Sequence, residues 1–239
     1  MTGQLPLALR WPAHQRLDSF VAGANTVALD AVRAAASREE QPWLYLCGPP
    51  GSGRTHLLVA ACAAASAGGR AAQYVSVAAL AARAAALRGL GGSRLLALDD
   101  LDAAAGDRDA ELALFELYNR CRAERATLLF AATVPPAQCG FGLPDLVSRL
   151  SACTQLALKP LGETERRELL RRRAAARGFE LDEAVLDWLF ARHARDLGAL
   201  TALLERIDAA ALAARRRVTV PFVRDLLDAD AARAPAERR

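Results

Sequence analysis

The sequence predicts an α/β fold, in which a parallel β-sheet domain is followed by a small domain made only of helices. Short apolar runs rich in β-forming residues alternate with longer segments of helical pattern in the first part of the chain. This alternation is typical of βαβ units, whose strands pair in a buried parallel sheet. After Pro160 the strand signal stops, and apolar residues recur at the three- and four-residue spacing of amphipathic helices.

The predicted elements follow one another along the chain. Strands are expected at 43–47, 73–77, 94–98, 127–131 and 154–158. Helical spacing of apolar residues then covers 169–170, 185–190 and 197–207, with glycines at 178 and 198 near the predicted helix ends. We expect four parts: an N-terminal segment over 1–16, an α/β domain over 17–159, a helical domain over 160–228 and a polar tail over 229–239.

The composition is that of a globular protein and argues against several functional classes. Of 239 residues, 53% are hydrophobic, and the net charge of +4 falls short of the dense basic stripe of a dedicated DNA binder. The five cysteines are odd in number and lack CxxC spacing, which argues against a disulfide framework or a zinc site. Trp11 and Pro12 interrupt any secretory signal, and prolines interrupt the longest uncharged stretch. We therefore expect a cytoplasmic protein without a membrane span.

A glycine-rich loop directly after the first predicted strand indicates phosphate binding. The run GPPGSGRT has the form GxxxxGK[ST] with Arg54 in the lysine position. Glycines let backbone N–H groups curl around a phosphate, the next helix adds its positive N-terminus, and Thr55 can ligate Mg²⁺. The candidate residues are Gly48, Gly51, Ser52, Gly53, Arg54 and Thr55. The alternative is an ordinary glycine-rich turn.

Arg54 shapes the expected chemistry of this loop. A guanidinium keeps the positive charge but is planar and broader than the ammonium of lysine. We therefore expect nucleotide binding, with the diphosphate favoured over the triphosphate, and weak or absent hydrolysis.

Two carboxylates end the third predicted strand, at the edge where open parallel sheets bind ligands. Asp99 would hold Mg²⁺ and Asp100 would orient a water or polarise it; the alternative is a pair of solvated turn residues.

Four segments resemble the DnaA-related AAA+ family and together cover roughly residues 17–228. They are LDSFVAGAN at 17–25, the continuation of the loop as RTHLL, LPDLVSRL at 143–150, which resembles an arginine-finger box, and ARDLGAL at 194–200, which resembles a sensor II helix. The resemblance implies a P-loop NTPase domain of the AAA+ type with a helical lid. It also implies that Phe20, Val21 and His56 border the nucleotide and that Arg195 reaches its phosphates from the lid. The alternative for Phe20 and Val21 is an apolar pair beneath a core helix. The alternative for Arg195 is an exposed helix arginine.

Within that family the chain is similar to the short regulatory inactivators of DnaA. We expect no helix-turn-helix domain of the kind that a full initiator carries, and an arginine at the position of Arg54 is common in that group. The peptide QLPLAL at 4–9 resembles the QLxLxL motif with which the group binds the DNA polymerase sliding clamp. An extended peptide of this kind inserts Leu5, Leu7 and Leu9 into an apolar groove while Gln4 anchors it by hydrogen bonds. The alternative is an apolar tail that packs on its own domain.

Arg149 is the residue on which the implied regulatory chemistry depends. The resemblance implies that its guanidinium enters the nucleotide site of a neighbouring DnaA molecule and stabilises charge on the γ-phosphate; the alternative is a solvated arginine that closes a helix. Where the family has an aspartate after the fourth core strand, Thr133 is the nearest substitute here, and a hydroxyl cannot act as an anion. The arginines of 166–177 alternate with glutamates, which favours a solvated, ion-paired face over contact with DNA or an acidic partner.

The resemblance therefore implies a regulator that binds ADP or ATP with Mg²⁺, binds the sliding clamp and DnaA, and contacts DNA only indirectly. It would stimulate hydrolysis of DnaA-bound ATP and so prevent re-initiation of chromosome replication. Whether the chain is itself an enzyme is left open, as is a homodimer, and activation of a partner ATPase is favoured over efficient hydrolysis of its own nucleotide. Two alternatives remain: a self-sufficient ATPase similar to DnaA or DnaC that loads a helicase or remodels DNA, and a nucleotide-independent adaptor.

Overall fold

The computed structural model describes residues 11–12, 14–38, 42–193, 197–214 and 217–233. Contacts between residues divide the chain into two compact units, Met1–Pro160 and Leu161–Arg239. The first unit contains all the strands of the described ranges, and the second contains helices. None of the helices that the structure describes combines the length and the apolar character needed to cross a membrane.

The first unit is built on a five-stranded sheet with the order β2-β3-β4-β1-β5. The strands are β1 (Leu44–Cys47), β2 (Ala72–Ser76), β3 (Leu95–Asp99), β4 (Thr127–Ala132) and β5 (Thr154–Ala157). Every neighbouring pair is parallel, and each strand begins within one residue of its predicted run. The prediction of a parallel sheet is confirmed.

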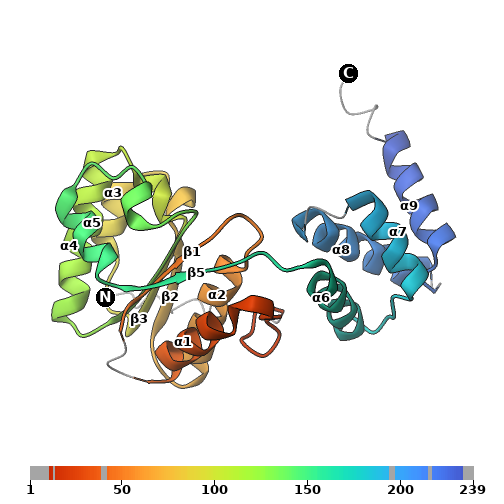
Figure 1. Cartoon of the computed structure of the whole chain (residues 1–239), viewed down its shortest axis with the longest axis horizontal. Helices are drawn as coiled ribbons and strands as arrows, with labels where there is room; N and C mark the ends of the chain where they lie inside the picture. The colour runs from red at the N-terminus through yellow and green to blue at the C-terminus, as the bar shows by residue number, and fades with distance from the viewer. Residues whose placement is uncertain (1–10, 13, 39–41, 194–196, 215–216, 234–239) are drawn as a thin grey trace, which may run out of the picture. The chain divides into compact units, whose positions relative to one another are not determined.

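Helices cover both faces of this sheet (Figure 1). α1 (Thr26–Ser37) and α2 (Arg54–Ala67) lie on one face, and α3 (Arg83–Gly89), α4 (Arg108–Ala123) and α5 (Pro144–Ser151) lie on the other. Alternate residues of the strands enter one of two separate apolar clusters, so both faces are buried. Burial on both faces explains why β1, β3 and β4 appear in the sequence as apolar runs. Short 3₁₀ helices lie at η1 (Gly23–Asn25), η2 (Val77–Ala79), η3 (Leu101–Ala104) and η4 (Pro136–Gln138).

The second unit is a helical domain with its own core. It contains α6 (Glu163–Ala176), α7 (Glu183–His193), α8 (Leu197–Ala214) and α9 (Val220–Arg233). The predicted helical domain is confirmed, but α9 continues beyond residue 228, where the sequence predicted a polar tail. Leu226 and Leu227 pack against the core, and the alanine-rich residues that follow favour continued helix. The predicted boundary between the helical domain and a polar tail at 229 stays a prediction.

Three arginines of α6, Arg167, Arg171 and Arg172, are paired with acidic side chains, as their spacing predicts. Arg167 lies 3.0 Å from Glu163 one turn away and 2.7 Å from Asp187 of α7. Arg172 lies 2.7 Å from Glu168, again at the i,i+4 spacing. This pairing on an exposed surface agrees with the interpretation of α6 as a solvated, ion-paired face.

Candidate functional site

The loop between β1 and α2 forms a cradle of closely approaching backbone. Gly51 and Gly53 have φ angles of 77° and 96°, in the left-handed region that favours glycine. A Cβ atom on Gly48 would lie 2.6 Å from the carbonyl oxygen of Leu158, and one on Gly53 would lie 2.7 Å from the ring of Phe20. Packing therefore favours glycine at 48, the backbone conformation favours it at 51, and both favour it at 53.

Two polar side chains of this loop are buried without a hydrogen-bond partner. In the described part of the chain three buried side-chain polar atoms lack a partner, and two of them, Ser52 Oγ and Arg54 Nη1, belong to this loop. An unsatisfied buried polar group costs roughly 1–3 kcal/mol, and more when it is charged. Both residues lie at the start of α2, where free N–H groups and the helix dipole favour an anion. A bound phosphate would supply the missing acceptor for Arg54 and a partner for the hydroxyl of Ser52.

Asp99 brings the loop and the third strand together. Its side chain is 1% exposed, and Oδ2 accepts hydrogen bonds from the Thr55 hydroxyl at 2.6 Å and from the Tyr74 hydroxyl at 3.0 Å. Burial, together with the adjacent Asp99 carboxylate, raises the pKa of Tyr74 above its usual value. Mg²⁺ takes oxygen ligands and is commonly held by one or two carboxylates together with substrate phosphates. The Thr55 hydroxyl and the Asp99 carboxylate therefore fit the predicted Mg²⁺ site.

The other acidic groups at this sheet edge already accept hydrogen bonds within the chain. Asp100 has a φ of 52°, which is uncommon for a residue other than glycine. Its carboxylate accepts a hydrogen bond from the Ser76 hydroxyl at 2.8 Å. The Thr133 hydroxyl donates to the carboxylate of Asp102 at 2.5 Å. Neither Asp100 nor Thr133 therefore presents a side chain that is free of intramolecular hydrogen bonds.

Three residues of this edge were missed from the sequence. Tyr74 and Ser76 lie in β2, and Ser76 pairs with Asp99 in the parallel register. Asp102 is the last acid in the run DDLD that follows the apolar part of β3. A polar residue that ends a neighbouring strand was the available signal for Ser76, and the third carboxylate in a short acidic run was the signal for Asp102.

The entry segment lies against the loop. Phe20 packs over Gly53, and its ring makes an edge contact with the ring of His56 at a centroid distance of 5.2 Å. His56 Nε2 lies 2.9 Å from the carbonyl oxygen of Arg16. Val21, the next residue, is partly buried. The structure thus brings Phe20 and His56 together at the loop, whereas contact with an adenine ring stays a prediction.

Arg149 lies in the last turn of α5 and is partly buried. Its guanidinium carbon lies 5.9 Å from the centroid of the Tyr118 ring on α4, a cation–π geometry. None of the ion pairs in the described ranges involves Arg149. Arg149 therefore rests on an aromatic ring and forms no ion pair with a carboxylate of the described residues, and its role as an arginine finger stays a prediction.

Five predicted residues lie outside the described residues: Gln4, Leu5, Leu7 and Leu9 of the expected clamp-binding peptide and Arg195 of the lid.

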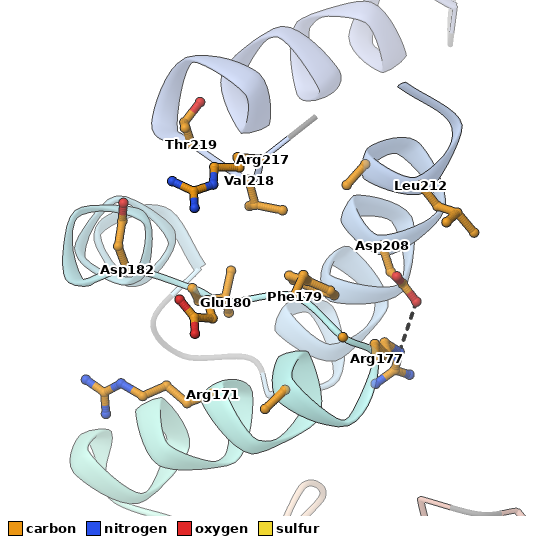
Figure 2. A pocket seen from close by; sticks show the side chains of 14 residues that line it. Arg171, Arg177, Phe179, Glu180, Asp182, Asp208, Leu212, Arg217, Val218 and Thr219 are labelled. Atoms are coloured by element: carbon orange, nitrogen blue, oxygen red, sulfur yellow. Dashed lines mark ion pairs between the residues drawn. The ribbon is translucent and has the colours of Figure 1, made fainter. Parts of the chain in front are cut away.

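The second unit also holds a cavity of about 990 Å³, seen in Figure 2, which none of the predicted site residues lines. In this cavity Arg177 forms an ion pair with Asp208 at 3.4 Å, and apolar residues such as Phe179 and Val218 complete the wall.

Comparisons with known proteins identify the relatives of both units. Residues 163–227 match the family model of the Hda lid domain. Domain III of the Thermotoga maritima replication initiation protein DnaA is similar in structure, with a TM-score of 0.75, 20% identity, and coverage of 92% of this chain and 98% of that one. The RuvB Holliday junction branch migration motor of the same organism gives a TM-score of 0.66 at 20% identity, with 92% and 72% covered.

AMPPCP-bound DnaA from Aquifex aeolicus gives a TM-score of 0.68 at 21% identity. The match covers 82% of this chain, which spans 66% of the length of that DnaA chain. At these identities the likeness to solved structures establishes the fold. The fold is therefore similar to that of DnaA and RuvB, and the helical unit matches the Hda lid domain over residues 163–227.

Proposed function

We propose that this chain is a regulator of DnaA that binds an adenine nucleotide with Mg²⁺ and stimulates hydrolysis of ATP bound to DnaA. The observation that carries the proposal is the state of Arg149, which is partly exposed, rests on Tyr118 and has no ion pair in the described part of the chain. An arginine of this kind is available to a phosphate outside its own subunit. The result would be DnaA bound to ADP and suppression of repeated initiation.

Nucleotide binding is supported by the unsatisfied donors of the loop. Backbone N–H groups between Gly48 and Thr55 and the guanidinium of Arg54 would hold the phosphates, and a structure of DnaA with a similar fold contains AMPPCP. Thr55 and Asp99 would hold Mg²⁺, which supplies charge neutralisation at the phosphates when bound. ADP is the proposed resident nucleotide, because the broad guanidinium of Arg54 stands where a compact ammonium usually contacts the terminal phosphate.

We do not propose that the chain itself hydrolyses ATP efficiently. Asp100 would have to orient or activate a water, yet its carboxylate accepts a hydrogen bond from Ser76. The side chain of Thr133 is uncharged, and its hydroxyl donates a hydrogen bond to the carboxylate of Asp102. The groups that would activate water are therefore engaged within the chain, whereas no carboxylate of the described residues forms an ion pair with Arg149.

The proposed chemical step takes place in the partner's nucleotide site. The Arg149 guanidinium would donate hydrogen bonds to the γ-phosphate of DnaA-bound ATP and stabilise the charge that develops there. Arginine fingers in phosphoryl-transfer systems contribute roughly 10³ to 10⁵ in rate. The peptide with Gln4, Leu5, Leu7 and Leu9 would bind the sliding clamp in an extended form and hold the regulator near DNA, so DNA contact is indirect.

The test is a DnaA-ATP hydrolysis assay in the presence of clamp loaded on DNA. Arg149→Ala should abolish the stimulation and keep clamp binding and folding, since a cation–π contact at a partly exposed site contributes only about 0.5–1 kcal/mol. Arg108→Ala is the matched control, because Arg108 is an exposed arginine at the start of α4. Full stimulation by the Arg149→Ala protein would refute the proposed function.

A second arm of the same assay examines the clamp peptide. Changing Gln4 and Leu5 to Ala should abolish clamp binding and clamp-dependent stimulation while nucleotide binding stays unchanged. Unchanged clamp binding would contradict the role proposed for the peptide. Appreciable ATP hydrolysis by the purified chain alone, stimulated by DNA, would instead favour a self-sufficient ATPase.

A further inference from the structure

Glu111 is a buried carboxylate in α4 for which the proposed chemistry has no direct use. Its side chain is 2% exposed, and none of the ion pairs in the described ranges involves it. Oε1 accepts hydrogen bonds from the backbone N–H groups of Gly106 at 2.9 Å and Gly142 at 3.0 Å. Oε2 accepts one from the N–H of Leu143 at 2.8 Å. Three backbone donors thus take the place of a basic partner.

Two of these donors lie at the start of α5, the helix that carries Arg149. Leu143 is the N-cap residue of α5, and its apolar side chain makes no capping hydrogen bond. An N-cap residue usually supplies a side-chain oxygen to the exposed N–H groups of the first turn. Here the carboxylate of Glu111, 32 residues earlier in the sequence, binds the N–H of the N-cap residue itself. Its negative charge also lies at the positive end of the helix dipole.

The same face of α4 holds both ends of α5. Tyr118 follows Glu111 by two helical turns, and its ring supports the guanidinium of Arg149. Leu146 and Leu150 of α5 are buried in the apolar cluster that also contains α4. The direction of Arg149 therefore depends on how α5 packs on α4. Glu111 holds the beginning of α5 in that packing.

We propose that Glu111 is a positioning residue for Arg149: its carboxylate fixes the beginning of α5, so that the guanidinium reaches the partner's phosphate in one defined direction. The proposal rests on the proposed function of Arg149 as an arginine finger. A misplacement of about 1 Å in a catalytic group can lower a rate on the order of 100-fold. The effect of Glu111 should therefore appear in the maximal rate and leave partner affinity nearly unchanged.

Glu111→Gln is the sharpest substitution. The amide keeps the shape of the side chain, but its NH₂ group replaces an oxygen that accepts a backbone N–H, so at least one of the three hydrogen bonds is lost. The matched control is Glu116→Gln on the same helix, because Glu116 is exposed and pairs with Arg88 away from α5. Both variants remove one negative charge from α4.

The experiment measures DnaA-ATP hydrolysis with loaded clamp, as a function of DnaA concentration, for the full chain. Glu111→Gln should lower the maximal stimulated rate roughly tenfold to 100-fold, with little change in half-saturating DnaA concentration, while Glu116→Gln has no effect. An unchanged maximal rate in the Glu111→Gln protein would overturn the proposal.

Hydrogen exchange separates the inference from the proposed function. The backbone amides of 142–151 should exchange faster in the Glu111→Gln protein, with unchanged exchange in α2 and unchanged ADP binding. Unchanged exchange over 142–151 would overturn the positioning role whatever the hydrolysis assay shows. A loss of stimulation in Arg149→Ala but not in Glu111→Gln refutes the Glu111 proposal alone, and no loss in either refutes the proposed function. If Glu111→Gln does not fold, Glu111→Asp carries the same expectations, because it keeps the charge on a side chain one methylene shorter.

Discussion

Replacement of Arg54 by Ala should weaken nucleotide binding without weakening the unliganded fold. The Nη1 atom of Arg54 is buried and has no hydrogen-bond partner in the described part of the chain. A hydrogen bond to a charged group contributes about 1.5–3 kcal/mol, which corresponds to roughly 10- to 150-fold in affinity. In the unliganded protein the same unpaired donor costs roughly 1–3 kcal/mol, so its removal should offset the packing lost with the side-chain stem. We therefore expect weaker ADP binding and a free energy of unfolding that is unchanged or higher.

The assay pairs calorimetric titration with ADP and denaturant unfolding without ligand. Arg70→Ala is the matched control, since Arg70 also has a buried unpartnered atom, Nε, but its Nη1 donates to the carbonyls of Ala35 and Ala36 at 2.9 Å. That variant should lower the free energy of unfolding by about 1–3 kcal/mol and keep its ADP affinity. If Arg54→Ala instead destabilises the unliganded protein by more than about 2 kcal/mol and binds ADP normally, the assignment of Arg54 to the phosphates is refuted.

Two further predictions concern the metal site and the cysteines. Asp99→Asn should remove the Mg²⁺ dependence of ADP binding, because an amide is a poorer Mg²⁺ ligand than a carboxylate; titrations with and without Mg²⁺ that still differ would contradict this. Burial raises the pKa of Cys62 and Cys153 to about 12 and that of Cys121 to about 11, so little thiolate is present at pH 8. A thiol reagent should reach the half-buried Cys139 first, with the rate rising as the pH rises, and rapid modification of buried thiols in the folded protein would disagree.

The strands β1, β3 and β4 were predictable because burial on both faces makes each of them an apolar run. The end of β3 shows where this signal fails. The apolar run stops at 98, whereas β3 continues to Asp99, which pairs with Ser76. Its buried carboxylate is tolerated because the hydroxyls of Thr55 and Tyr74 donate to it. A short-range pattern does not contain these donors, one of which lies 44 residues away.

The site was predictable where a local motif defines it and unpredictable where the fold brings distant groups together. The loop from Gly48 to Thr55 is contiguous, and Gly51 and Gly53 are explained by local backbone conformation. Glu111 had no such signal, because a glutamate on an amphipathic helix usually faces water. Its donors at Gly142 and Leu143 become neighbours only when α5 packs on α4. The missing partner of Arg54 is likewise a property of the folded loop alone.

The surroundings of Arg149 determine the free-energy cost of moving its side chain from its own subunit into the nucleotide site of a partner. A guanidinium in a buried ion pair would be costly to remove, since breaking such a pair destabilises a protein by roughly 3–5 kcal/mol. Arg149 rests instead on the ring of Tyr118, a contact of about 0.5–1 kcal/mol. A charge-assisted bond to a phosphate contributes about 1.5–3 kcal/mol, so the exchange of ring for phosphate is favourable. Because the helix beneath it stays fixed by Glu111, the proposed transfer requires only rotation of the arginine side chain, and not rearrangement of α5.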